Sequence, residues 1–178
     1  KNPAEFRPDL FSEAVQLDAE CLARLSEAHG FVRAMYASGR PLPDDRHLRF
    51  MPHLAGALCR LTQGSLVFDT VCERFWTSEA WARELGEGSG AERFDLHVRL
   101  VELRTTEGLR LETRGLRKVG SAELRLEPAS EDLATVCTHL LRSLAEAVFH
   151  GDRANQVELE AFGDSYVLQL MPRGGYLQ

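Results

Sequence analysis

Three cations and two glycines form a basic turn within the stretch LETRGLRKVGSAELRLEP (111–128). The cations are Arg114, Arg117 and Lys118, and the glycines are Gly115 and Gly120. Glycine permits positive φ and close approach of the backbone, so such a turn can offer amides and cationic side chains to an anion. The three cations are therefore candidate binding residues.

The same turn also suits a purely structural role, and we favour this interpretation. A phosphate-binding loop usually has a denser glycine pattern and leads into a helix, whereas a strand-like run follows here. Glu112 and Glu123 are near enough in the sequence to offset the positive charge. We therefore expect the three cations to be largely solvated, with positive φ at one or both glycines.

Asp95 and His97 are separated by one residue in the alternating run FDLHVRLVELR (94–104). In a β-strand both side chains would point to the same face, where the carboxylate could orient the imidazole as a general base. A polar outer face of a sheet is the commoner role of such a pair. Asp95 and His97 are the catalytic candidates of this sequence.

Two tryptophans lie close together in RFWTSEAW (74–81). Trp76 and Trp81 are candidate binding residues, because tryptophan is enriched among the residues that dominate protein interfaces. Packing in the core is the commoner role, and we expect it for both.

Other catalytic and cofactor patterns are missing from the sequence. There is no GxSxG nucleophile elbow and no GxGxxG motif after a strand, and GEGSG (86–90) is typical of a linker. His47 and His53 lack the spacing of a helical metal site, and no CxxC pair occurs. We expect no metal and no cofactor. The cysteines expected to be free, reduced thiols are Cys21, Cys59, Cys72 and Cys137.

The composition is that of a globular, acidic protein. The 178 residues are 44% hydrophobic and 27% charged, and a chain of this length can bury a core without metals or disulfides. The net charge of −6 predicts no general attraction to nucleic acid or to an anionic membrane. No stretch approaches the roughly 20 apolar residues of a membrane span. Together with the reduced cysteines, these features predict a cytoplasmic protein.

Hydrophobic periodicity predicts an α+β fold, a two-layer sandwich with helices packed on a mixed, largely antiparallel sheet. Helices are expected over 9–28, from near Pro52 to Gly64, over 77–85 and over 130–151. Thr77 or Ser78 can cap the helix over 77–85. Strands are expected over 65–69, 94–104, 109–115 and 122–128, with a final hairpin over 157–172 that turns at Phe162-Gly163-Asp164. Residues 31–39 fit either a continued helix or a strand, and we favour a strand. Residues 1–30 are expected to form a helical arm, and 31–178 a single domain.

The helix over 130–151 has the most regular pattern in the chain. Ser130 can cap it and Gly151 can end it. Its expected buried face consists of Leu133, Val136, Leu140, Leu144 and Val148.

Two stretches, LAGALCRLTQGSLVFDTVCERFWTSEAW (54–81) and LETRGLRKVGSAELRLEPASEDLATVCTHLLRSLAEAVF (111–149), resemble an uncharacterised bacterial family, domain of unknown function 4261. The resemblance implies a compact bacterial α+β domain, and it assigns no catalytic residue. It also implies that Gly115 and Gly120 belong to a turn that the fold requires.

These observations favour a non-enzymatic protein-interaction or regulatory domain of the bacterial cytoplasm, such as an immunity-type or accessory subunit. Its acidic surface, with acids in LPDD (42–45) and GEGSGAE (86–92), would bind a basic protein partner. No catalytic constellation assembles in the sequence, and neither nucleic acid nor membrane is an expected partner.

The alternative is a hydrolase or anion-binding enzyme with a dispersed site. The residues that this site would use are Asp95, His97, Arg114, Arg117 and Lys118. They converge only if the strands over 94–104 and 109–115 pair through the TTEG turn (105–108). A concave pocket that contains His97 and Arg114 would favour the enzyme.

Overall fold

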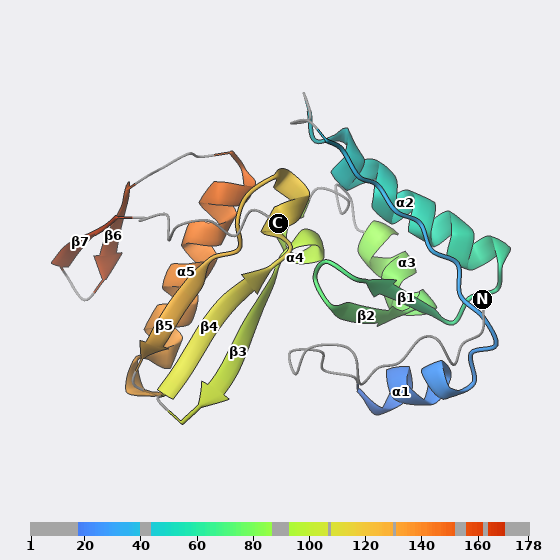
Figure 1. Cartoon of the computed structure of the whole chain (residues 1–178), viewed down its shortest axis with the longest axis horizontal. Coiled ribbons are helices and arrows are strands. Elements are labelled where there is room, and N and C mark those ends of the chain that lie inside the picture. Colours follow the sequence, from blue (N-terminus) through green and yellow to red (C-terminus); the bar gives the residue numbers. More distant parts are fainter. Residues whose placement is uncertain are drawn as a thin grey trace.

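The computed structural model describes residues 18–39, 44–86, 93–106, 108–129, 131–151, 156–161 and 164–169. Within these residues the chain has an α+β fold, as the sequence predicts. Figure 1 shows two lobes that follow one another along the chain, with the short helix α4 (Phe94–His97) between them.

The first lobe packs three helices around a two-stranded antiparallel hairpin. The helices are α1 (Ala19–Ser26), α2 (Arg46–Leu61) and α3 (Ser78–Gly86). The strands are β1 (Leu66–Asp69) and β2 (Arg74–Thr77), which pair only with each other among the described strands. Thr77 begins α3 as predicted, because its Oγ1 accepts a hydrogen bond from the amide of Ala80 at 3.2 Å.

The second lobe consists of a three-stranded antiparallel sheet covered by one long helix (Figure 1). The strands, in their order across the sheet, are β3 (Arg99–Thr105), β4 (Gly108–Arg114) and β5 (Arg125–Ala129). The helix α5 (Ala134–Phe149) packs on the sheet through a core of Leu109, Leu111 and Leu141. Thr105 pairs with Gly108, so the predicted hairpin turn between β3 and β4 is confirmed.

Two short 3-10 helices complete this lobe, η4 (Leu116–Val119) in the basic turn and η5 (Glu131–Leu133) before α5. A separate hairpin, β6 (Gln156–Ala161) and β7 (Asp164–Gln169), follows α5 as predicted. Its turn residues Phe162 and Gly163 lie outside the described residues. The predicted cap at Ser130 and most of the predicted arm, residues 1–17, also lie outside them.

Apolar side chains from both lobes meet at two places. Leu48 of α2 packs with Phe94, Leu116 and Phe149, and Leu96 of α4 packs with Trp76 and Trp81.

The packing of α5 on the three-stranded sheet confirms the predicted packing of a helix on an antiparallel sheet. The described strands nevertheless form three separate sheets instead of one mixed sheet, because the β1–β2 hairpin is covered by the helices of its own lobe. The division into an arm and a single domain stays a prediction.

Two predictions in the first lobe are wrong. Residues 31–38 belong to no strand; they run in an extended course, and Phe31, Val32, Met35 and Tyr36 are all exposed. The helix α2 begins at Arg46, so Pro52 lies in its interior and not in its first turn. Proline there removes the N–H that would bond to the carbonyl of Leu48 and its ring crowds that carbonyl, and Pro52 is buried.

The strand predicted over 94–104 is wrong at its start. Phe94–His97 is a helical turn, closed by the amide of Val98 on the carbonyl of Phe94 at 2.8 Å, and β3 begins only at Arg99. Phe94, Leu96 and Val98 are all buried on and after this helical turn, so their spacing in the sequence resembles the alternation of a strand.

The β2 strand was not predicted, and β5 begins three residues later than expected, at Arg125.

The buried face of α5 is rotated from the predicted one. Its buried residues are Leu141, Leu144, Ala145 and Phe149, and only Leu144 belongs to the predicted set. Leu133 lies in η5 and is 49% exposed. The prediction is wrong because the α-helix begins after Leu133, and α5 meets both the sheet and Phe94.

Candidate functional site

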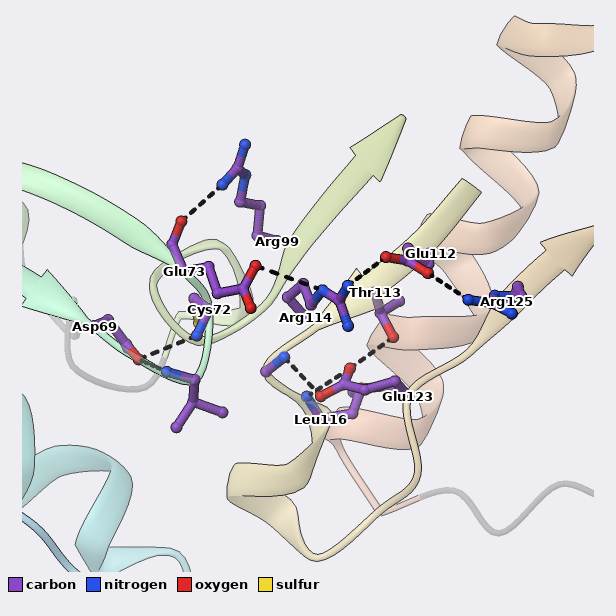
Figure 2. Close-up of polar contacts among 12 residues, drawn as sticks. Asp69, Cys72, Glu73, Arg99, Glu112, Thr113, Arg114, Leu116, Glu123 and Arg125 are labelled. Carbon is purple, nitrogen blue, oxygen red and sulfur yellow. Dashed lines mark hydrogen bonds and ion pairs between the residues drawn. The ribbon is translucent and has the colours of Figure 1, made fainter. Parts of the chain in front are cut away.

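The amides of the basic turn bind an anion that the chain itself supplies, the carboxylate of Glu123. This carboxylate accepts hydrogen bonds from the backbone N–H of Gly115 at 2.9 Å, of Leu116 at 3.3 Å and of Arg117 at 3.4 Å. The Oγ1 of Thr113 donates a fourth bond at 2.8 Å, and Figure 2 shows Glu123 held between the turn and β4. Successive amides of this kind form an anion-binding nest, and Glu123 fills it.

Both glycines of the turn have positive φ, +125° at Gly115 and +74° at Gly120, so that prediction is confirmed. Gly115 has a second reason to be glycine. A Cβ at this position would lie 1.9 Å from the carbonyl oxygen of His97, whereas a Cβ at Gly120 would meet open space. The turn therefore packs directly against the backbone of α4.

Lys118 is mostly covered, so the prediction of three largely solvated cations is wrong for this residue. Its Nζ lies 2.5 Å from the Oδ2 of Asp69 and donates to the Sγ of Cys72 at 3.1 Å. The Lys118 side chain is 15% exposed and that of Asp69 is 17% exposed. Lys118 is covered because of a tertiary contact, since β1 of the first lobe ends at Asp69 beside the turn.

The Asp69–Lys118 pair keeps both groups charged despite burial. Burial alone would raise the pKa of Asp69, but the Lys118 ammonium and the hydrogen bonds from Lys118, Cys72 and Val71 together lower that pKa from its ordinary value of 3.8. Burial would likewise lower the pKa of Lys118, but the Asp69 carboxylate raises it above 10.5. The buried charges thus compensate each other.

The Cys72 thiol takes part in the same cluster as a hydrogen-bond donor. Burial, and then the Asp69 carboxylate, raise its pKa to about 12. Its Sγ donates to the carbonyl oxygen of His97 at 2.8 Å. A buried, protonated thiol of this kind is not an activated nucleophile.

Arg114 belongs to a chain of ion pairs, and its side chain is only 27% exposed, so it is not largely solvated either (Figure 2). Its guanidinium lies 2.5 Å from the Oε1 of Glu112 and 3.9 Å from the Oε2 of Glu73. Glu112 is buried and also pairs with Arg125 at 3.2 Å. Of the three cations, the side chain of Arg117 alone is exposed as predicted.

The structure does not bring Asp95 and His97 together. Both lie on the helical turn α4, where the side chains of residues two apart point in directions about 160° apart. Asp95 is exposed and pairs with Arg142 at 2.8 Å, whereas His97 is 2% exposed and stacks on Phe149 at 5.8 Å. The expectation that they share one face is wrong, because it rested on a strand.

Both candidate tryptophans are core residues. Trp76 and Trp81 are buried, and their ring centroids are 4.9 Å apart in an edge-to-face arrangement. The Nε1 of Trp81 donates to the carbonyl of Pro52 at 3.3 Å. Core packing is confirmed, and neither ring is exposed to a partner.

A cavity of about 320 Å³ lies between α2 and α3. Its lining residues include Gly56, Cys59, Arg60 and Trp81. Neither His97 nor Arg114 lines it, so it is not the pocket that the enzyme hypothesis requires.

A surface that the sequence analysis missed covers α2 and the extended segment 28–38. Nine large apolar side chains are exposed among the described residues, and six of them belong to this surface. They are Phe31, Val32, Met35, Tyr36, Phe50 and Leu61. The 11-residue spacing of Phe50 and Leu61, which brings both to one side of a helix, was the available signal.

No family model, no characterised protein and no solved structure matches this chain. The resemblance to domain of unknown function 4261 therefore stays a prediction. Over the described ranges, no group of three or more His, Cys, Asp or Glu side chains is placed to hold a metal ion. Of the helices in the described part of the chain, none has the length and apolar composition needed to cross a bilayer.

Proposed function

We propose that this chain is a non-enzymatic protein-interaction domain of the regulatory or accessory kind. The observation that carries the proposal is the surface of α2 and segment 28–38, on which the exposed apolar side chains gather. Met35 is 72% exposed and Leu61 is 81% exposed, although both are apolar. Several exposed large apolar side chains on one surface of a globular domain are typical of a binding site for another protein.

The polar clusters support the same proposal, because the groups that could bind or react with a substrate instead stabilise the fold. The nest amides bind Glu123, the Lys118 ammonium pairs with Asp69, and the Cys72 thiol is protonated. A hydrolase or anion-binding enzyme would need such groups to face a substrate. The proposed setting is the bacterial cytoplasm, and the four free cysteines are in keeping with a reducing compartment.

Selection from a displayed random-peptide library tests the proposal. Peptides recovered on the parent protein should bind it saturably and lose binding to Met35→Ser/Phe50→Ser. The matched control is Leu133→Ser, which also removes an exposed apolar side chain but lies in the second lobe. Recovery of no peptide above background, or equal binding to Met35→Ser/Phe50→Ser, would refute the proposed function.

A further inference from the structure

The exposed face of α2 is cationic, although the chain as a whole carries a net charge of −6. Residues 46–61 contain no Asp or Glu. At about 100° per residue, the six side chains on this face fall within roughly 120° of each other. They are Arg46, Arg49, Phe50, His53, Arg60 and Leu61, all exposed. The buried residues Leu48, Pro52, Gly56 and Cys59 occupy the other side of the helix.

The extended segment 28–38 continues this face along one flank. Figure 1 shows it following the line of α2, and the ring of Tyr36 stacks on His47 of α2 at 5.7 Å. The segment also lacks acids and carries Arg33. Its exposed Phe31, Val32 and Met35 therefore add apolar area to a surface whose charged side chains are arginines, of which Arg46 pairs with Asp44 at 2.7 Å.

We infer that this surface, residues 28–38 with the exposed face of α2, binds an acidic amphipathic segment of another protein. The inference rests on the proposed function and specifies the chemistry of its partner. Apolar side chains of the partner would contact Met35, Phe50 and Leu61, while its carboxylates would pair with the arginines. The acidic composition of the whole chain predicted a basic partner, but the charge of this surface is the opposite.

The charge distribution favours a short acidic protein segment over a polyanion. Since residues 28–38 and 46–61 hold arginines without acids, the remainder of the chain is more acidic than the whole. A nucleic acid or an anionic bilayer extends beyond the surface and would face this acidic remainder. A short segment meets the cationic face alone.

The composition of peptides selected on the parent protein tests this inference. Enriched peptides should combine Asp or Glu with Leu, Phe or Met and carry net negative charge. Their affinity, measured by fluorescence anisotropy, should fall as salt rises from about 0.1 M to about 1 M. The charge-reversal variant Arg49→Glu/Arg60→Glu should weaken binding at least about tenfold.

The matched control is Arg83→Glu/Arg104→Glu, which reverses two exposed charges away from this surface. It should bind the same peptides within about twofold of the parent. Enrichment of basic peptides, or affinity indifferent to Arg49→Glu/Arg60→Glu and to salt, overturns the inference but leaves the proposed function standing. Binding of phosphatidylserine vesicles or duplex DNA that the charge reversal abolishes also overturns it, because the occupant would then be a polyanion. Failure to select any peptide counts against the proposed function itself.

Discussion

The Nζ of Lys118 lies 2.5 Å from the Oδ2 of Asp69, a residue 49 positions earlier in the chain. Asp69 ends β1 in the first lobe, and Lys118 belongs to η4 in the second. The other carboxylate oxygen of Asp69 accepts hydrogen bonds from the amides of Val71 and Cys72, at 2.9 and 3.1 Å. One carboxylate therefore shapes the turn after β1 and joins this turn to the second lobe.

Lys118→Met should lower the free energy of unfolding by about 3–5 kcal/mol, because it leaves the Asp69 carboxylate buried without its partner. Arg117→Ala, which removes the exposed neighbouring cation, should change it by no more than about 0.5 kcal/mol. Urea denaturation of both variants measures the difference. Equal, small effects would mean that the Asp69–Lys118 pair contributes nothing to stability.

The same pair predicts a specific dependence of stability on pH. The folded pKa of Asp69 lies below 3.8, so its contribution is present above that unfolded value and is lost as the pH falls through the folded pKa. The folded pKa of Lys118 lies above 10.5, so its contribution is present below that value and is lost as the pH rises through the folded pKa. Stability of the parent should therefore fall more steeply at both extremes than that of Asp69→Asn/Lys118→Met. Parallel stability–pH profiles of the two proteins would contradict the prediction.

Glu123→Ala should destabilise the fold by about 2–4 kcal/mol, because the nest amides and the Thr113 hydroxyl lose a charged acceptor. The emptied nest should then accept an external anion, so sulfate or phosphate should raise the melting temperature of Glu123→Ala more than that of the parent. Glu102→Ala, an acid on an exposed position of β3, is the control. An equal response of all three proteins to sulfate would show that the nest does not select anions.

Gly115→Ala should cost more than about 4 kcal/mol or prevent folding, because its Cβ would collide with the carbonyl of His97 and φ is +125°. Gly120→Ala should cost only about 1 kcal/mol, since φ is +74° there but the space is open. Thermal unfolding compares the two variants. Similar losses would indicate that backbone strain alone, and not the close approach to α4, determines the requirement for glycine.

Leu141→Ala should lower the free energy of unfolding by about 2–5 kcal/mol, because Leu141 lies in the core beneath the sheet. Leu133→Ala should change it by about 0.5 kcal/mol at most, because Leu133 is exposed. Denaturant titration checks both. The reverse order would restore the buried face that the sequence alone predicts for α5.

Local signals predicted much of the fold. The alternation of β4, the turn before it, the cap at Thr77 and the final hairpin all depend on neighbouring residues. The β2 strand was missed because its turn contains no glycine, and Glu73 instead adopts a φ of +53°. The aspartate at the end of β1 was the available signal, since an Asp side chain can close a turn on the amides that follow it.

The candidate site was less accessible to sequence reasoning because its contacts are distant in the chain. Nothing near Lys118 indicates that its partner is Asp69 or that a thiol lies beside both. For Glu123 the sequence identified both components, an acid and a basic glycine turn, but not that the acid binds the amides. The alternation of Phe94 and Leu96 was compatible with a strand and with a helical turn, so it could not place Asp95 and His97.

The seam between the two lobes is rich in hydrogen bonds that reach across it. Beyond the Asp69–Lys118 pair, the donors and their carbonyl acceptors are Cys72 to His97, Arg74 to Asp95, Arg99 to Glu73 and His47 to Lys118. Apolar contact permits sliding because it is non-directional, whereas hydrogen bonds weaken steeply as they bend. The seam therefore sets the angle between the lobes, and a protein bound to α2 would also fix the orientation of the three-stranded sheet relative to itself.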